Sequence, residues 1–255
     1  MRALYFGEKG RQLLGFHHAP IGKGKSTAVL CCHPAPQEYM RSYRAVKNLA
    51  EGISRSGLHV LRFDWSGTGD SAGDLRDARL ATWQQDLAVA AEELLDLSGA
   101  RRLAIVGLRL GASVAALACA RPRQLLAEPL VLWDPVIRGT VWLEATAQAH
   151  LRHLDQYRFE PQPDPGSLLG YPLAPALRGD LAGLDLSALA APAKGRSIFL
   201  LPRANPDQLA LAAAWQAEVV QVPDAQDLED PAVESAFLTG VLGRAVGAAL
   251  APEAA

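Results

Sequence analysis

Apolar and polar positions form blocks along this chain that predict strands and helices in turn. Short apolar runs, typical of buried strands, occupy residues 28–32, 59–64, 103–106, 130–133, 197–201 and 218–222. Between them, apolar residues recur at helical spacing in residues 44–56, 82–97, 112–120 and 207–216, and a last helix is expected over 231–249. Strands that alternate with helices indicate an α/β fold with a doubly wound, parallel sheet.

Turn residues separate these elements. Residues 4–6 and 11–18 flank Gly-Glu-Lys-Gly, which predicts a β-hairpin at the start of the chain. Gly57 follows the first helix as a C-terminal glycine does. A glycine-rich turn spans 65–73. With the hairpin included, we expect about eight strands in a mostly parallel sheet.

Residues 136–192 interrupt the alternation. A helical piece at 141–154 precedes two stretches rich in proline and glycine, Pro161-Gln-Pro-Asp-Pro-Gly and Gly170-Tyr-Pro-Leu-Ala-Pro. Such a segment predicts an insertion that covers the sheet as a cap or lid. We expect a single domain over residues 1–255, with the cap inside it.

Composition bears on location and partners. The chain has 255 residues, 49% of them hydrophobic, which suits one sizeable core. A net charge of −2 provides no basic face, so we expect neither nucleic acid nor an anionic membrane as a partner. Three cysteines make no disulfide framework, no apolar leader opens the chain, and no apolar run approaches the roughly 20 residues of a membrane span. These features predict a cytoplasmic protein, and the abundance of arginine and alanine indicates a high-GC bacterial genome.

The sequence Gly107-Leu-Arg-Leu-Gly joins a predicted strand to a predicted helix. A sharp turn of the form G-x-S-x-G presents a nucleophilic serine in many hydrolases. Both glycines are present here, at 107 and 111, but the central residue is Arg109. A guanidinium stays protonated and has no lone pair for attack. The sequence therefore predicts the sharp turn that would present a nucleophile, but without a nucleophilic side chain at its centre.

Two further patterns accompany this turn: His33-Pro-Ala-Pro after the third strand, and FDWSGTGDSAG at 63–73. With the order of elements, the three resemble the α/β-hydrolase superfamily over nearly the whole chain, although Ser66 replaces the arginine of the family's D-x-R-G-x-G-x-S turn. HPAPQEYMRSYRA, GLRLGA and GYPLAPAL together resemble a bacterial subgroup named exosortase-associated or serine-aminopeptidase-like hydrolases. Some members of that subgroup are linked to exopolysaccharide gene clusters. The resemblance implies a fold, and fold alone implies no activity.

The resemblance also implies a triad in the order nucleophile, acid, histidine, which this sequence lacks at the usual places. Arg109 holds the nucleophile position. The acid after the seventh strand would fall on Asn205, and Asp207 is expected to begin a helix instead. The histidine would fall near residues 226–227, yet no histidine follows His153. We therefore assign no catalytic residue.

The other histidines and cysteines suggest no alternative site. His150 and His153 share a face of the cap helix, but no Glu or Cys at a suitable spacing completes a metal site, so we expect no metal and no cofactor. Cys32 and His33 are neighbours on an extended segment and point to opposite faces, which argues against a nucleophile–base pair. Cys31 and Cys32 are expected in the core. The histidines expected at surface, edge or structural positions are His17, His18 and His59.

A cation at a helix N-terminus is disfavoured by up to about 1 kcal/mol, so an anion should compensate Arg109. Asp134, at the end of the neighbouring strand, is the acid candidate and would accept the guanidinium. Alternatively, Arg109 and the backbone N–H groups of Leu110 and of loop 33–36 would bind a carboxylate, phosphate or sulfate. His33 would either line that pocket or brace the loop. The candidate ligand-binding residues are Arg109, Leu110, His33, Ala35 and Asp134.

Three functions stay open. The first is a non-hydrolytic protein of the α/β-hydrolase fold that binds an acidic or acyl ligand, or assists an active paralogue, in exopolysaccharide or lipid metabolism. The second is a hydrolase of an ester, thioester or peptide with Cys32 or a cap residue as nucleophile. The third is an interaction protein that binds a partner through its cap helix, near Trp133 and Trp142. The lack of a serine at position 109 favours the first.

Overall fold

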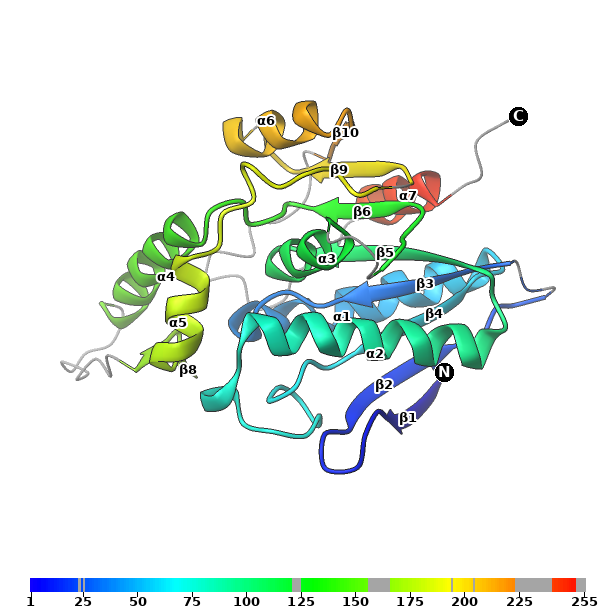
Figure 1. Cartoon of the computed structure of the whole chain (residues 1–255), viewed down its shortest axis with the longest axis horizontal. Helices are drawn as coiled ribbons and strands as arrows, with labels where there is room; N and C mark the ends of the chain where they lie inside the picture. Colours follow the sequence, from blue (N-terminus) through cyan, green and yellow to red (C-terminus); the bar gives the residue numbers. More distant parts are fainter. Residues whose placement is uncertain are drawn as a thin grey trace.

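A computed structural model of the chain describes residues 1–22, 24, 26–120, 125–155, 166–193, 195–203, 205–222 and 240–250. The strands of its central sheet are β1 (Arg2–Phe6), β2 (Leu13–His18), β3 (Thr27–Cys32), β4 (His59–Phe63), β5 (Arg102–Leu108), β6 (Leu130–Trp133), β9 (Ser197–Leu201) and β10 (Glu218–Gln221). They lie in the order β1-β2-β4-β3-β5-β6-β9-β10 (Figure 1). β1 and β2 form the predicted antiparallel hairpin, β2 is antiparallel to β4, and the strands from β4 to β10 in that order run parallel. The prediction of eight mostly parallel strands is confirmed.

Helices cover both faces of this sheet. α2 (Leu80–Ser98) and α3 (Leu110–Ala120) pack on one face, and α1 (Pro36–Arg55) and α7 (Gly240–Ala249) pack on the other (Figure 1). α6 (Pro206–Ala214) connects β9 to β10. The fold is therefore the doubly wound α/β arrangement that the alternation predicts. Of the predicted last helix, residues 231–239 lie outside the described residues.

Successive residues of β3 belong to two different cores. Ala28, Leu30 and Cys32 pack beneath α2 and α3, whereas Val29 and Cys31 pack beneath α1 and α7, and all five are fully buried. Side chains alternate between the faces of a strand, so a strand covered on both faces is apolar at every position. This explains why residues 28–32 form an unbroken apolar run.

The helix α1 begins at Pro36, so the predicted start at residue 44 is wrong. Proline suits a first helical turn, where its missing N–H has no helical partner in any case. The next residues, Gln37 and Glu38, are polar yet buried, and a search for apolar periodicity overlooks them. The earlier start places Glu38 at the carboxyl end of the parallel strands. Gly57 follows α1 with a φ of +88°, as predicted.

The segment 136–192 is called the cap segment below, and its described residues lie beyond the carboxyl ends of the parallel strands (Figure 1). Its elements are α4 (Gly139–Leu154), the short hairpin β7 (Ser167–Leu168) and β8 (Tyr171–Pro172), and α5 (Pro175–Ala182). An ion pair of 2.7 Å between Arg79 Nε and Asp180 Oδ2 ties α5 to the start of α2. Of the stretch that begins at Pro161, residues 161–165 lie outside the described residues.

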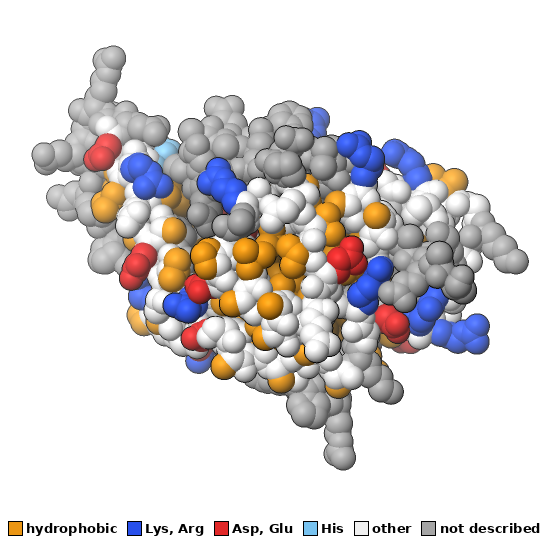
Figure 2. All heavy atoms as spheres, turned by 90° about the horizontal axis from the view of Figure 1, so that it is seen from above, with side chains coloured by type: hydrophobic (Ala, Val, Ile, Leu, Met, Phe, Trp, Pro, Cys, Tyr) orange, Lys and Arg blue, Asp and Glu red, His pale blue; other side chains and the backbone are white. Residues whose placement is uncertain are grey.

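The sheet ends at β10, a strand of four residues. Figure 2 looks onto the molecule from this side and shows apolar side chains near the centre of the face, with acidic and basic side chains around them. Leu209 and Val219 are among the large apolar residues that the protein exposes, each at 38%. None of the described helices is both long and apolar enough to cross a membrane.

Candidate functional site

The turn between β5 and α3 centres on Arg109. Its φ of +52° lies in the left-handed region, which is strained for a residue with a side chain. Two glycines allow the sharp geometry, because a Cβ at Gly107 would lie 2.5 Å from the Cα of Ala112 and a Cβ at Gly111 would collide with the carbonyl oxygen of His33. The Arg109 N–H donates to the Trp133 carbonyl at 2.9 Å, which fixes the turn to β6. The turn therefore has the tight strand-to-helix geometry that its glycines predict.

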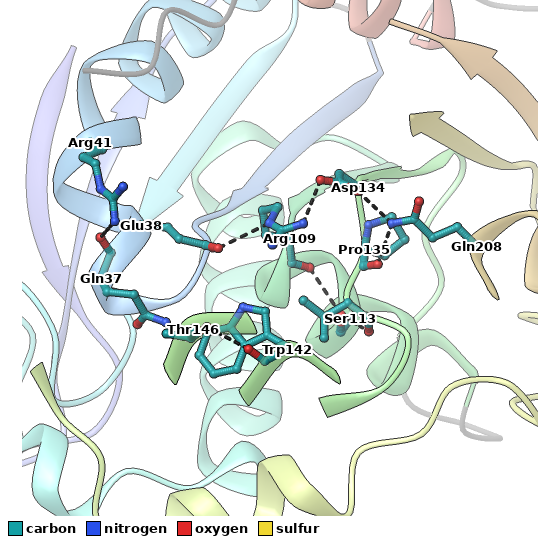
Figure 3. Close-up of polar contacts among 11 residues, drawn as sticks. Gln37, Glu38, Arg41, Arg109, Ser113, Asp134, Pro135, Trp142, Thr146 and Gln208 are labelled. Atoms are coloured by element: carbon teal, nitrogen blue, oxygen red, sulfur yellow. Dashed lines mark hydrogen bonds and ion pairs between the residues drawn. The ribbon is translucent and has the colours of Figure 1, made fainter. Parts of the chain in front are cut away.

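The Arg109 side chain lies between two carboxylates (Figure 3). Its Nη1 donates to Asp134 Oδ2 at 2.7 Å, and its Nε donates to Glu38 Oε1 at 3.3 Å. Arg109 is 6% exposed and Glu38 is 2% exposed. The contact with Asp134 was expected, because β6 is the neighbour of β5. The contact with Glu38 is not predicted by the sequence, because the residues around Glu38 do not indicate that this helix residue is buried.

Asp134 divides its two oxygens between two partners. Oδ2 accepts from Arg109, while Oδ1 accepts from Gln208 Nε2 at 2.7 Å. The same Gln208 nitrogen donates to the Pro135 carbonyl at 2.9 Å, so this glutamine fixes the end of β6 from α6. Asp134 has a φ of +45°, a second strained residue at this end of the sheet. Glu38, Arg109, Asp134 and Gln208 thus form one polar network.

Two carboxylates already pair with the Arg109 guanidinium, those of Glu38 and Asp134. A further anion would have to displace a carboxylate or share the cation with two. The arrangement therefore satisfies the cation from within the protein and holds the turn against α1 and β6.

His33 lies inside the protein, beneath α1. Its ring is fully buried and packs against Tyr39, with ring centroids 4.9 Å apart, and against Tyr43 at 6.3 Å. Burial lowers the pKa of His33 to about 3, so the ring is neutral at pH 7. The His33 carbonyl accepts a hydrogen bond from Trp65 Nε1 at 3.1 Å. This placement favours the bracing interpretation of His33, and a role in ligand binding stays a prediction.

The cysteines and remaining histidines also lie away from a reactive arrangement. Cys32 is fully buried, and burial raises its thiol pKa well above the ordinary value. His18 is only 3% exposed, on a strand inside the sheet, and accepts from Arg62 Nε at 3.4 Å, so its predicted surface or edge position is wrong. His150 accepts a hydrogen bond from the Leu169 N–H at 3.1 Å. No group of three or more potential metal ligands occurs in the part of the chain that the structure describes.

A small apolar cavity lies between the cap segment and the body of the protein. About 20 Å³ of it is open to the centre of a water molecule, which is room for about one water. Of the predicted ligand-binding residues, Ala35 and Leu110 are in its wall. Other wall residues on the body and the cap segment include Gln37, Trp83, Trp142, Leu173 and Leu177. The cavity sits beside the Arg109 turn, since Leu110 is the residue that follows it.

Comparison with protein families identifies the relatives of this chain. Residues 27–172 match the model of the family described as serine aminopeptidase, S33. The chain belongs to the serine aminopeptidase S33 family. This region contains β3, Glu38, the Arg109 turn, Asp134 and the first part of the cap segment, whereas Gln208 and the wall residues Leu173 and Leu177 lie beyond it.

Solved structures share the fold of this family member. The ferulic acid complex of Est1E from Butyrivibrio proteoclasticus superposes with a TM-score of 0.70 at 16% identity, over 98% of this chain and 100% of that one. A hydrolase from Pseudomonas aeruginosa gives 0.66 at 20% identity, over 98% of both chains. A serine hydrolase homologue from Coxiella burnetii gives 0.56 at 16% identity, over 87% of this chain and 85% of that one. Comparison with curated proteins found no match. These likenesses establish the α/β-hydrolase fold.

The other positions where the family resemblance implies catalytic residues carry different side chains here. Asn205, at the expected acid position, is the N-cap of α6, and its Oδ1 accepts from the N–H groups of Asp207 and Gln208 at 3.0 and 3.4 Å. Asp207 lies in the first turn of α6, as expected, and pairs with Arg138 on the surface at 3.1 Å. The expected histidine position, residues 226–227, lies outside the described residues.

Proposed function

We propose that this protein is a non-hydrolytic member of its family, in which the Arg109 turn corresponds to the nucleophile elbow. The observation that carries the proposal is the guanidinium at the centre of that turn, held by Glu38 and Asp134 at 3.3 and 2.7 Å. A positively charged arginine offers no lone pair for attack on a carbonyl. Its two carboxylate partners favour a structural role for it over one in anion binding.

Three observations on other residues support the same proposal. The sequence has no histidine after His153 to act as the base. His33 is close to the turn through its backbone, but its ring is buried and neutral. The nucleophile suggested for an active hydrolase, Cys32, is fully buried with a raised pKa, whereas reactive cysteines are accessible and have a lowered one. The alternative of an active hydrolase thus rests on family membership and an unidentified cap residue.

The role that we propose is that of a ligand-binding or accessory protein, and the apolar cavity beside the turn is the ligand site. Ala35 and Leu110 supply part of its wall. The motifs HPAPQEYMRSYRA, GLRLGA and GYPLAPAL support a place in the exosortase-associated bacterial subgroup, and hence a link to exopolysaccharide or acyl metabolism with an active paralogue as partner. A cytoplasmic location stays a prediction.

A fluorophosphonate probe tests the absence of hydrolytic chemistry. The purified protein should show no covalent labelling, because arginine replaces serine at position 109 and the described wall of the cavity contains no serine. Nitrophenyl esters, acyl thioesters and aminoacyl anilides should show no turnover above the buffer rate, with an active serine hydrolase as the positive control. Stoichiometric labelling, or turnover abolished by Cys32→Ala or by a cap substitution, would contradict the proposal. Capture of a paralogue by the tagged protein would support the accessory role.

A further inference from the structure

The last strand of the sheet has an outer edge without a neighbouring strand in the part of the chain that the structure describes. There β10 pairs with β9 alone, and the Val222 N–H donates to the Leu201 carbonyl at 2.8 Å. Backbone groups alternate in direction along a strand, so the N–H and C=O groups of Val220 also face β9. Those of Val219 and Gln221 point away from the sheet. Such an edge is a template on which another strand can pair.

Natural proteins usually protect an edge strand with lysine, proline or a bulge. Residues 218–221 of β10 include neither lysine nor proline, and their register with β9 is continuous, without a bulge. Val219, whose backbone groups point outward, is 38% exposed. The edge at β10 therefore lacks the features that would discourage pairing.

The helix α6 adds apolar surface beside this edge, because it connects β9 to β10 and lies at the same side of the molecule (Figure 1). The exposed positions of α6 are all uncharged, namely Pro206, Leu209, Ala210, Ala213 and Ala214. The exposed positions of α2, for comparison, include Gln85, Glu92 and Asp96. Solvent-facing sides of helices are ordinarily polar, so an apolar one indicates a contact. Figure 2 shows apolar side chains near the centre of this face and charged ones around them.

We propose that the edge face, which consists of β10 and the exposed side of α6, binds the edge face of a second copy of this chain. The β10 edge is complementary to itself in an antiparallel arrangement. In the register that pairs both outward-facing residues, Val219 lies opposite Gln221 of the second copy, and the two Val220 residues lie opposite each other. The N–H groups of each copy then meet the C=O groups of the other, and the two sheets become one. Twofold pairing is the commonest arrangement of identical subunits.

The same arrangement covers the exposed side of α6. The twofold axis runs perpendicular to the joined sheet, so both α6 helices lie on the same face of it. Leu209, which is 38% exposed, supplies apolar area there, and the short side chains of Ala210 and Ala213 allow the helices to approach closely. The edge face therefore fits a second copy in both its hydrogen bonds and its apolar surface.

The charges that border the edge face do not oppose this contact. Asp207, in the first turn of α6, pairs with Arg138 at 3.1 Å, and Glu218, at the start of β10, pairs with Arg196 at 3.6 Å. In an antiparallel arrangement the start of one β10 meets the end of the other, so Glu218 does not meet its own counterpart. Two copies therefore bring together paired charges rather than like charges.

The association state of the purified protein tests the inference. Sedimentation equilibrium at about 100 µM should give a mass of twice the 27.2 kDa chain, and a dilution series gives the dissociation constant of the dimer. Amide hydrogen exchange of a peptide that spans β10 should be slower in the dimer than in variants that are monomeric, because the outward N–H groups are then hydrogen-bonded.

Matched variants assign the dimer to the edge face. Val219→Lys puts a charge on the strand and Leu209→Glu puts one on α6, so each should raise the dissociation constant at least about 10-fold. Gln221→Pro removes an N–H that points away from β9, so it should weaken the dimer while β10 stays in the sheet. The controls are Val141→Lys and Leu151→Glu on α4, which make the same changes at positions that are 54% and 58% exposed. They should leave the dissociation constant within about 2-fold.

A monomer at about 100 µM would overturn the inference, and so would a monomer that binds a different protein through this face. A dimer that persists in Val219→Lys, Leu209→Glu and Gln221→Pro would have the same force, because it would place the contact elsewhere. Equal weakening by Val141→Lys would move the contact to the cap segment and would also overturn it. None of these measurements depends on catalysis, so failure of the proposed function would appear separately, as fluorophosphonate labelling.

Discussion

Replacement of Arg109 by methionine should destabilise the protein by leaving Glu38 buried without its cation. Methionine is unbranched at Cβ, so the strain of the left-handed φ is similar in both proteins. At an effective dielectric constant of about 20, unit charges 3.3 Å apart attract by about 5 kcal/mol. Removing one member of a buried pair costs about 3–5 kcal/mol, and we expect a loss in that range for Arg109→Met.

The partner variant shows whether the two residues act as a pair. Glu38→Gln leaves Arg109 with Asp134 and should cost about 1.5–3 kcal/mol, the loss of one charge-assisted hydrogen bond. In Arg109→Met/Glu38→Gln no uncompensated charge is left at position 38. The double variant should therefore be at least about 2 kcal/mol more stable than the sum of the single losses predicts. Arg79→Met, at the exposed pair with Asp180, is the control and should cost far less, because solvent screens that pair.

Urea unfolding at pH 7.5 and pH 5.0, followed by circular dichroism, measures these losses. A buried carboxylate that loses its cation is less costly when it is protonated, so the loss of unfolding free energy in Arg109→Met should shrink as the pH falls to 5.0. The pairing would be refuted if the single-variant losses of unfolding free energy summed to the double-variant loss within about 0.5 kcal/mol and the loss in Arg109→Met were the same at both pH values.

Three other predictions test the turn and its surroundings. Arg109→Ser should raise the turnover of a short-chain nitrophenyl ester by less than about 100-fold, the low end of what a general base contributes; a larger rise would reveal a hidden base. Gly111→Ala should lower the free energy of unfolding by about 1–3 kcal/mol, because the added Cβ meets the His33 carbonyl, whereas Gly52→Ala, a helical site with open space, should not; equal melting temperatures would mean that the turn tolerates a side chain. The folded-state pKa of His33 is about 3, so its contribution to stability is complete above about pH 6.5 and is lost as the pH falls toward 3. Between pH 7.5 and 5.5 the His33 contribution to the free energy of unfolding should fall by about 1.4 kcal/mol. His33→Phe should remove this fall, as measured by urea unfolding at the two pH values.

Much of the fold could be predicted because it follows from local pattern. Strands buried on both faces, such as residues 28–32, form continuous apolar runs, and helices show their own spacing. The Arg109 turn was found in the same way, since its two glycines and the elements on either side are neighbours in sequence. The absence of a serine at 109 and of a histidine after 153 is a matter of residue identity alone. The ion pair with Asp134 required one more assumption, the order of adjacent strands.

The tertiary structure decided which side chains share the buried space around that turn. Glu38 reaches Arg109 across 71 residues, and in sequence it resembles any acidic residue of a first helical turn. The burial of His33 beneath α1 and the approach of Gln208 to Asp134 depend in the same way on how helices pack on the sheet. Local periodicity reports which face of an element is apolar, but it does not report a polar residue buried against another polar residue. That pairing is a property of distance in space, and it arises only when α1, β6 and α6 pack at one end of the same sheet.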